Sequence, residues 1–207
     1  MPNDPQRRTT EGLRRLIMFS DAVVAIAMTL LVLPVADVAG KLQVQRTFLQ
    51  AVGEHRNELM GFIVSFTVIW VLWRNHHQIM ENYRNYNSTM FNVHFAWLLS
   101  IVVLPLATAL ISNDQVPWAD AFYLVVLAVA IGSLITIARQ GARHRDLLVD
   151  DDDVRAGLAG WSGVGTLLAL VVALVITLVW PSVGSLPLLL LLIPGPVNAL
   201  VTRVRGG

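Results

Sequence analysis

The chain has 207 residues, of which 55% are apolar and only 14% are charged, whereas soluble domains carry roughly 25% charged residues. This composition excludes an ordinary soluble enzyme and predicts an integral membrane protein. The net charge is only +1, no cysteine is present, and the arginines are scattered, so disulfides, thiolate sites and nucleic-acid binding are not expected. The polar residues 1–13 lack an apolar core and a cleavage site, which argues against a removed signal peptide.

The hydropathy pattern predicts an all-α protein with one domain, residues 1–207, and six transmembrane helices. About 20 apolar residues in a helix cross a hydrocarbon core of roughly 30 Å. The second apolar run is short, so its helix is expected to continue through His77. Pro34 is expected to be tolerated or to kink the last turn of the first helix. The predicted spans are residues 16–36, 57–77, 90–111, 118–138, 158–180 and 186–202.

The distribution of arginine predicts the orientation of these spans. Arginines occur in the N-terminal tail, in the loops after the second and fourth spans, and at the C-terminus. The loops between spans three and four and between spans five and six contain no Lys or Arg, and only the first outer loop blurs the pattern. Because positive residues stay on the cytoplasmic side, both termini are predicted to be cytoplasmic.

The first span carries a carboxylate inside an apolar sequence. Between residues 16 and 36 the strongly polar residues are Ser20, Asp21 and Thr29. A charge within a span costs at least about 2.5 kcal/mol and is normally kept for a function. Arg15 and Asp21 lie about 240° apart around the helix, so they cannot pair within it and each is expected to reach a neighbour.

The predicted topology brings polar residues of three spans to the same cytoplasmic end. Buried polar groups need partners, and here the partners come from different helices. The residues expected to converge are Arg15, Ser20, Asp21, Arg74, His76, His77, Asn92 and His94.

A helical wheel separates two faces of the first span. Ile26, Thr29 and Leu33 fall in one band with Leu30 beside them, and Asp21 lies about 140° from Ile26. If this band lined a conduit, its apolar rings could gate by dewetting and its hydroxyl could replace part of an ion's hydration shell. If it packed on lipid or helices, it would need no special role. The wheel alone leaves both interpretations open and favours packing.

The stretch Arg15-x-x-x-Phe19-Ser20-Asp21, continued from Ala22 to Val35, resembles the signature of the transmembrane protein 175 family, the endolysosomal potassium channel and its prokaryotic homologues. The resemblance is most specific over residues 15–35, and six spans extend it to nearly the whole chain. It implies a potassium-selective channel in a prokaryotic plasma membrane, without a carbonyl filter or a cofactor. It also implies a homotetramer in which the first helices of four chains line a central pathway for potassium, the permeant ion. Many members have glycine where this chain has Ala22.

The resemblance also implies roles for individual residues. Ile26 takes the position of a hydrophobic constriction, Thr29 that of a hydroxyl ring and Leu33 that of a second apolar ring, with Leu30 beside them on the pore-lining face. The other motif residues are implied to hold the helix ends together. This structural network comprises Arg15, Phe19, Ser20, Asp21, Trp73, His76, His77 and Asn92.

Two polar clusters have alternative interpretations. His76, His77 and Glu81 could be metal ligands, but zinc needs three or four protein ligands and no second cluster is evident, so no metal site is predicted. The run Asp150–Asp153 could attract cations to a vestibule. A solvated loop that ends at a helix N-terminus is the favoured interpretation.

The main functional alternative is a proton- or cation-coupled carrier that uses Asp21 as a relay. Carriers usually show internal repeats and broken helices near the midplane, whereas Asp21 lies near one end of its span and no repeat is evident. An intramembrane enzyme would need a second aspartate, a serine–histidine pair or a zinc site, and none has credible spacing. The sequence therefore predicts a channel that is not an enzyme, with potassium ions, the lipid bilayer and copies of itself as partners.

Overall fold

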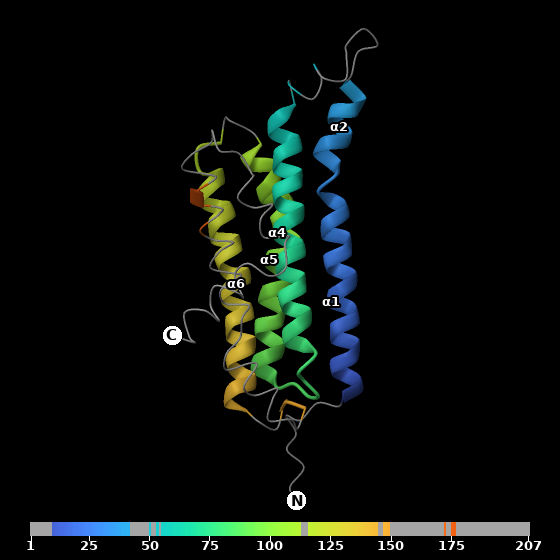
Figure 1. The fold of residues 1–207 in the computed structure, drawn as a ribbon, viewed down its shortest axis with the longest axis vertical. Coiled ribbons are helices and arrows are strands. Elements are labelled where there is room, and N and C mark those ends of the chain that lie inside the picture. The colour runs from blue at the N-terminus through green and yellow to red at the C-terminus, as the bar shows by residue number, and fades with distance from the viewer. Residues whose placement is uncertain are drawn as a thin grey trace, which may run out of the picture.

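The computed structural model describes residues 10–41, 50, 53, 55–112, 116–144, 147–149, 172 and 175–176. In this part of the chain, long helices run side by side along one axis (Figure 1). They are α1 (Thr10–Leu30) with its continuation α2 (Leu33–Lys41), α4 (Arg56–Met80), α5 (Ser88–Ile111) and α6 (Ala119–Arg143).

Four segments of the described residues are long and apolar enough to cross a membrane. They are Thr10–Asp37, Glu58–Met80, Ser88–Ile111 and Ala119–Arg143, and they fall where the sequence predicts the first four spans. The predicted spans 158–180 and 186–202 lie outside the described residues, apart from the helical residues 172, 175 and 176.

The first span is interrupted near its C-terminal end. α1 ends at Leu30 and α2 begins at Leu33, with a turn at residues 31 and 32 in which the Val32 amide donates to the Thr29 carbonyl at 3.2 Å. Proline explains this break, because Pro34 has no N–H for the carbonyl four residues earlier and its ring collides with that carbonyl. The helix then resumes and continues to Lys41, beyond the predicted end at residue 36.

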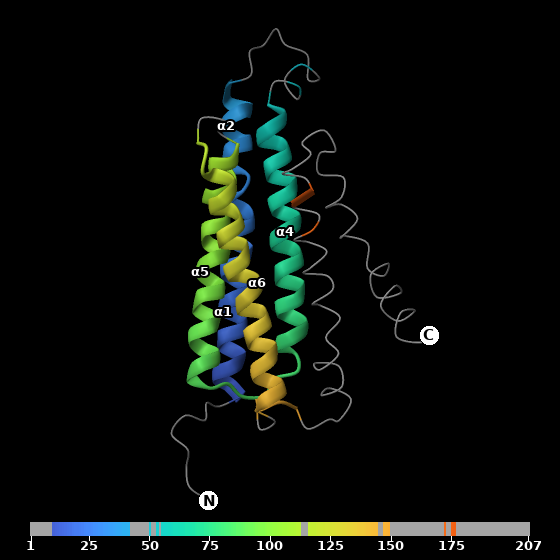
Figure 2. The ribbon, with the colours of Figure 1, turned by 90° about the vertical axis from the view of Figure 1, so that its left-hand side faces the viewer.

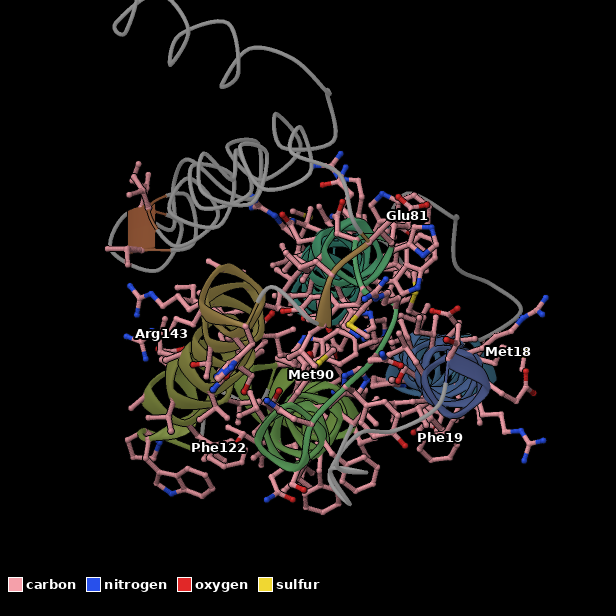
Figure 3. The ribbon with its side chains drawn as sticks, turned by 90° about the horizontal axis from the view of Figure 1, so that it is seen from below. Met18, Phe19, Glu81, Met90, Phe122 and Arg143 are labelled. Atoms are coloured by element: carbon pink, nitrogen blue, oxygen red, sulfur yellow. The ribbon has the colours of Figure 1, made fainter. Side chains whose placement is uncertain are left out.

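α5 is the central helix of the described bundle and packs on α1, α4 and α6. α1 and α6 lie on opposite sides of it, as the view along the bundle axis shows (Figure 3). The Asn87 side chain begins α5 by accepting a hydrogen bond from the Met90 amide at 2.8 Å, which satisfies one free N–H of the first turn. The side chains that α5 buries include Met90, Trp97, Ile101 and Leu104.

Three buried hydroxyls join α4, α5 and α6. Thr108 donates to the Leu104 carbonyl of its own helix at 2.8 Å, its oxygen lies 2.7 Å from the Ser65 hydroxyl, and Ser65 lies 3.3 Å from the Tyr123 hydroxyl. Gly61 makes the approach of α4 to α5 possible, because a Cβ there would lie 2.9 Å from the Ser112 hydroxyl. These contacts fix the relative rotation of the three helices.

A clasp, formed by residues 82–85 and 147–149, closes the end of the bundle at which α4 leads into α5. Tyr83 and Leu148 form an isolated antiparallel bridge, and the Arg84 amide donates to the Leu147 carbonyl at 2.9 Å. The buried Tyr83 hydroxyl donates to the Ile137 carbonyl of α6 at 2.5 Å. Burial raises the pKa of Tyr83, so this hydroxyl keeps its proton and remains a donor. The clasp ties α4, α5 and α6 together at the end of the bundle where α1 begins (Figure 2).

Candidate functional site

α1 has one buried face and one exposed face. The buried residues Leu13, Ser20, Val24 and Ala27 recur at helical spacing and pack towards α4 and α5. The opposite face carries the residues predicted to line a pore. Ile26 is 59% exposed and Leu33 is 55% exposed, and Leu30 and Thr29 are exposed beside them. Within one subunit, this face therefore lies free of the described helices.

Thr29 presents its oxygen on that exposed face. Its hydroxyl proton is directed at its own helix, because the hydroxyl donates to the Ile26 carbonyl at 2.7 Å. The lone pairs of the oxygen remain available. A hydroxyl in this state can accept from water or contact a cation.

Ser20 joins α1 to α5. Its hydroxyl lies 2.6 Å from His94 Nε2, and both side chains are fully buried. The same hydroxyl donates to the Leu16 carbonyl at 2.7 Å. Because a serine has one proton to donate, it accepts from His94 Nε2, which sets the histidine in the Nε2–H tautomer.

Asp21 joins α1 to α4. Trp73 Nε1 donates to its Oδ1 at 2.9 Å. The Trp73 ring stacks on His77, with centroids 5.5 Å apart, and His77 Nε2 lies 3.2 Å from a carboxylate oxygen of Glu81. Two consecutive residues of α1 thus contact two different helices.

His76 is buried between α4 and α5 and is 1% exposed. Its ring stacks on Trp97, with centroids 4.1 Å apart and planes at 9°, and it meets the edge of His94 at 4.8 Å. The structure thus brings Ser20, His76 and His94 together and places Asp21 beside Trp73.

Three other residues of the predicted network lie elsewhere. Arg15 was expected to reach a neighbouring helix, yet its Nε donates to Glu11 of its own helix at 3.2 Å. Phe19 is 60% exposed and points away from the bundle (Figure 3). Asn92 is exposed and lines a shallow depression with Tyr86, Ser88 and Phe91.

The resemblance implied the histidines of α4, with Trp73 and Asn92, as partners of the α1 motif, and the sequence analysis did not include Trp97. The structure gives Ser20 to His94 and places Trp97 against His76. The available signal was the three-residue spacing of His94 and Trp97, which puts both on one face of α5. Among the residues that the structure describes, no group of three or more His, Cys, Asp or Glu could hold a metal ion.

The family model described as "Endosomal/lysosomal potassium channel TMEM175" matches residues 15–105. Over this segment, 91 of the 207 residues, the chain is similar to the TMEM175 family. The resemblance predicted from the Arg15–Asp21 motif is thus confirmed. The matched segment contains Ser20, Asp21, Trp73, His76 and His94, so the contacts between α1 and its neighbours lie within it.

Curated relatives are also channels by name. A potassium channel of Streptomyces collinus is 32% identical over 127 residues, covering 56% of this chain and 59% of the relative. A potassium channel of Chamaesiphon minutus is 30% identical over 122 residues, covering 56% and 60%. The mouse endosomal/lysosomal proton channel TMEM175 is 25% identical over 134 residues, covering 62% of this chain and 26% of the mouse protein. The matched region is thus about three fifths of the bacterial relatives and a quarter of the mouse protein.

A solved structure shares the fold. The crystal structure of a lysosomal potassium-selective channel TMEM175 homologue from Chamaesiphon minutus superposes with a TM-score of 0.61 and 24% identity, covering 88% of this chain and 95% of the other. The described part of the chain therefore shares an all-helical fold with this channel homologue, and four of its segments are long and apolar enough to cross a membrane.

Proposed function

We propose that the protein is a potassium-selective channel whose pathway is lined by the exposed face of α1. Ile26 and Leu33, with Leu30 beside them, form a hydrophobic constriction, and Thr29 supplies a ring of hydroxyl oxygens between them. Potassium is the permeant ion, and no cofactor or metal is required.

One observation carries this proposal. The face of α1 that holds Ile26 is exposed, while the opposite face is fastened by Ser20 to His94 and the flank by Asp21 to Trp73. Apolar constrictions gate by dewetting, and hydroxyl groups replace part of an ion's hydration shell. The division of α1 into a fastened face and an open face fits a helix that is held by its own subunit and turned towards a shared axis.

The complete channel follows from the same proposal. Four copies of a six-span subunit surround the axis, each with both termini in the cytoplasm and all in the plasma membrane of a prokaryote. The potassium channels of Streptomyces collinus and Chamaesiphon minutus support potassium as the ion, whereas the mouse relative is named a proton channel. Both ions must therefore be measured.

The deciding experiment is ion flux from purified protein in liposomes, with potassium and then sodium gradients and a pH-sensitive dye inside. We expect fast flux that prefers potassium and does not require proton movement. Slow, saturable flux locked to protons would overturn the proposal in favour of a carrier that uses Asp21. The hydrogen bond from Trp73 to Asp21 does not favour that carrier, because it gives the carboxylate a structural partner away from the Ile26 face.

The constriction is tested by Ile26→Asn, with Ile26→Leu as the apolar control. Asparagine should wet the constriction and raise potassium conductance at least several-fold, while leucine should keep it low. Equal conductance in both variants and in the unmodified protein would remove Ile26 from the pathway.

A further inference from the structure

A cluster of aromatic rings beneath Ser20 contains buried nitrogens that no described residue satisfies. They are Nδ1 and Nε2 of His76, Nδ1 of His94 and Nε1 of Trp97. All three side chains are fully buried or nearly so, at 1%, 0% and 0% exposure respectively. The rings touch one another, since His76 lies 4.1 Å from Trp97 and 4.8 Å from His94 between centroids. Four unmatched polar atoms therefore share one small region.

The chemistry of each nitrogen can be assigned. Ser20 donates its proton to Leu16 and accepts from His94 Nε2, so Nδ1 of His94 carries a lone pair. The Trp97 indole nitrogen is a donor. A neutral His76 provides one donor and one acceptor. The cluster thus presents two donors and two acceptors, which is a balanced set.

Leaving such groups dry is costly. A buried donor or acceptor without a partner costs about 1–3 kcal/mol, and the cluster contains four. Direct bonds among the rings do not satisfy them, because the face of His76 lies flat on Trp97 at 9° and its nitrogens lie at the ring edge. Buried water typically makes about three hydrogen bonds to groups of this kind.

We propose that the cluster of His76, His94 and Trp97 is a binding site for buried water. At least one water molecule accepts from the Trp97 indole of α5 and donates to a ring nitrogen of His76 on α4. It connects α4 to α5 directly behind the Ser20–His94 contact, so α1 rests on a hydrated junction. This inference is independent of the ion that the protein conducts.

The test is solid-state nitrogen-15 NMR of histidine-labelled full-length protein in lipid bilayers, with magnetisation transferred from water. The triple variant His55→Gln, His77→Gln, His144→Gln still contains His76 and His94, so its ring signals come from the cluster. We expect transfer from slowly exchanging water to these nitrogens and shifts typical of hydrogen-bonded imidazole. If no magnetisation passes from water to the ring nitrogens of His76 and His94, the water site is overturned, whatever chemical shifts these nitrogens show.

A thermal measurement provides a second readout on unlabelled protein. His76→Phe keeps a ring on Trp97 and removes both unmatched nitrogens of His76. If the site holds water, the variant removes hydrogen bonds that hold the water and leaves the nitrogens of His94 and Trp97 without a stable partner. The melting temperature then falls more than in the neighbouring control His77→Phe. If the site is dry, His76→Phe removes two costly groups and the melting temperature rises, which would contradict the proposal.

Discussion

At the scale of residues, α1 binds its neighbouring helices through one set of side chains and exposes another set. Ser20 and Asp21 each bind a side chain of another helix, whereas Ile26 and Thr29 have no neighbour on the outer face within the described subunit. Polar groups in a span are expensive and persist where they have partners or a task. Removal of the Ser20 hydroxyl should therefore affect stability, whereas removal of the Thr29 hydroxyl should affect ion preference.

Exchanging each hydroxyl for hydrogen tests this separation. Ser20→Ala leaves His94 Nε2 unpaired and should lower the free energy of unfolding by about 1–3 kcal/mol, measured by thermal or denaturant unfolding in detergent. Thr29→Ala should change that free energy little but lower the preference for potassium over sodium, measured from the bi-ionic reversal potential. If Ser20→Ala altered selectivity while Thr29→Ala altered stability, the assignment of the two faces would be wrong.

Two glycines of α6 provide a matched pair, of which only Gly141 lies against the clasp. A Cβ at Gly141 would lie 2.6 Å from the Tyr83 hydroxyl, whereas nothing lies within 4 Å of a Cβ at Gly132. Alanine favours a helix over glycine by up to about 1 kcal/mol, so Gly132→Ala should raise the melting temperature. Gly141→Ala should lower it, because overpacking of this kind costs about 1–3 kcal/mol. Similar melting temperatures for the two variants would show that Tyr83 can move away from a Cβ at position 141 without loss of stability.

At the scale of elements, α5 explains what the sequence could not reveal. Its residues are apolar on nearly every side, so no wheel indicates which side is buried, and the contact of His94 with Ser20 depends on that rotation. The first four spans could be predicted because length and hydropathy suffice for a membrane helix. The faces that meet are set by packing with other helices, through contacts such as Gly61 against Ser112, and single-sequence periodicity does not contain them.

The hydroxyl chain of α4, α5 and α6 makes a prediction at this scale. Thr108→Val removes the hydroxyl that hydrogen-bonds to Ser65 while keeping the side-chain shape, and should cost about 1–3 kcal/mol of unfolding free energy. Thr136→Val is the control, because the Thr136 hydroxyl donates to Gly132 of its own helix. Thr108→Ser should recover most of the loss. If Thr108→Val and Thr136→Val lowered the free energy of unfolding equally, the three buried hydroxyls would have no role in joining the helices.

At the scale of the whole molecule, the alternating direction of the helices predicted which polar residues lie near one another better than any local sequence pattern did. Alternating helices bring the start of α1, the end of α4 and the start of α5 to one end, and this is why Ser20, Asp21, His76 and His94 could be expected together. The sequence analysis expected Arg15 to contact a neighbouring helix and did not predict its pair with Glu11. Residues four apart on a helix surface can pair without any contact between helices, so such a pair competes with contacts to other helices.

The absence of cysteine from the sequence allows a clean test of assembly. If four α1 helices meet at an axis, Ile26→Cys should form disulfide-linked dimers under mild oxidation, because its partners lie across a narrow constriction. Val125→Cys on α6 is the control, since α6 lies across α5 from α1 and Val125 is similarly exposed (Figure 3). Denaturing gels without reductant provide the readout. Equal cross-linking at both positions would argue against a central α1.

The break between α1 and α2 also distinguishes a wet environment from a lipid one. Pro34 offers no amide to the Leu30 carbonyl, so that oxygen must find another donor. In hydrocarbon an unsatisfied backbone group costs several kcal/mol, and non-helical backbone at membrane depth survives where it is covered by protein or faces water. Leu30 is exposed beside Ile26 and Leu33. The proline therefore makes hydrocarbon an unfavourable neighbour for the Leu30 carbonyl, which needs a protein donor or water.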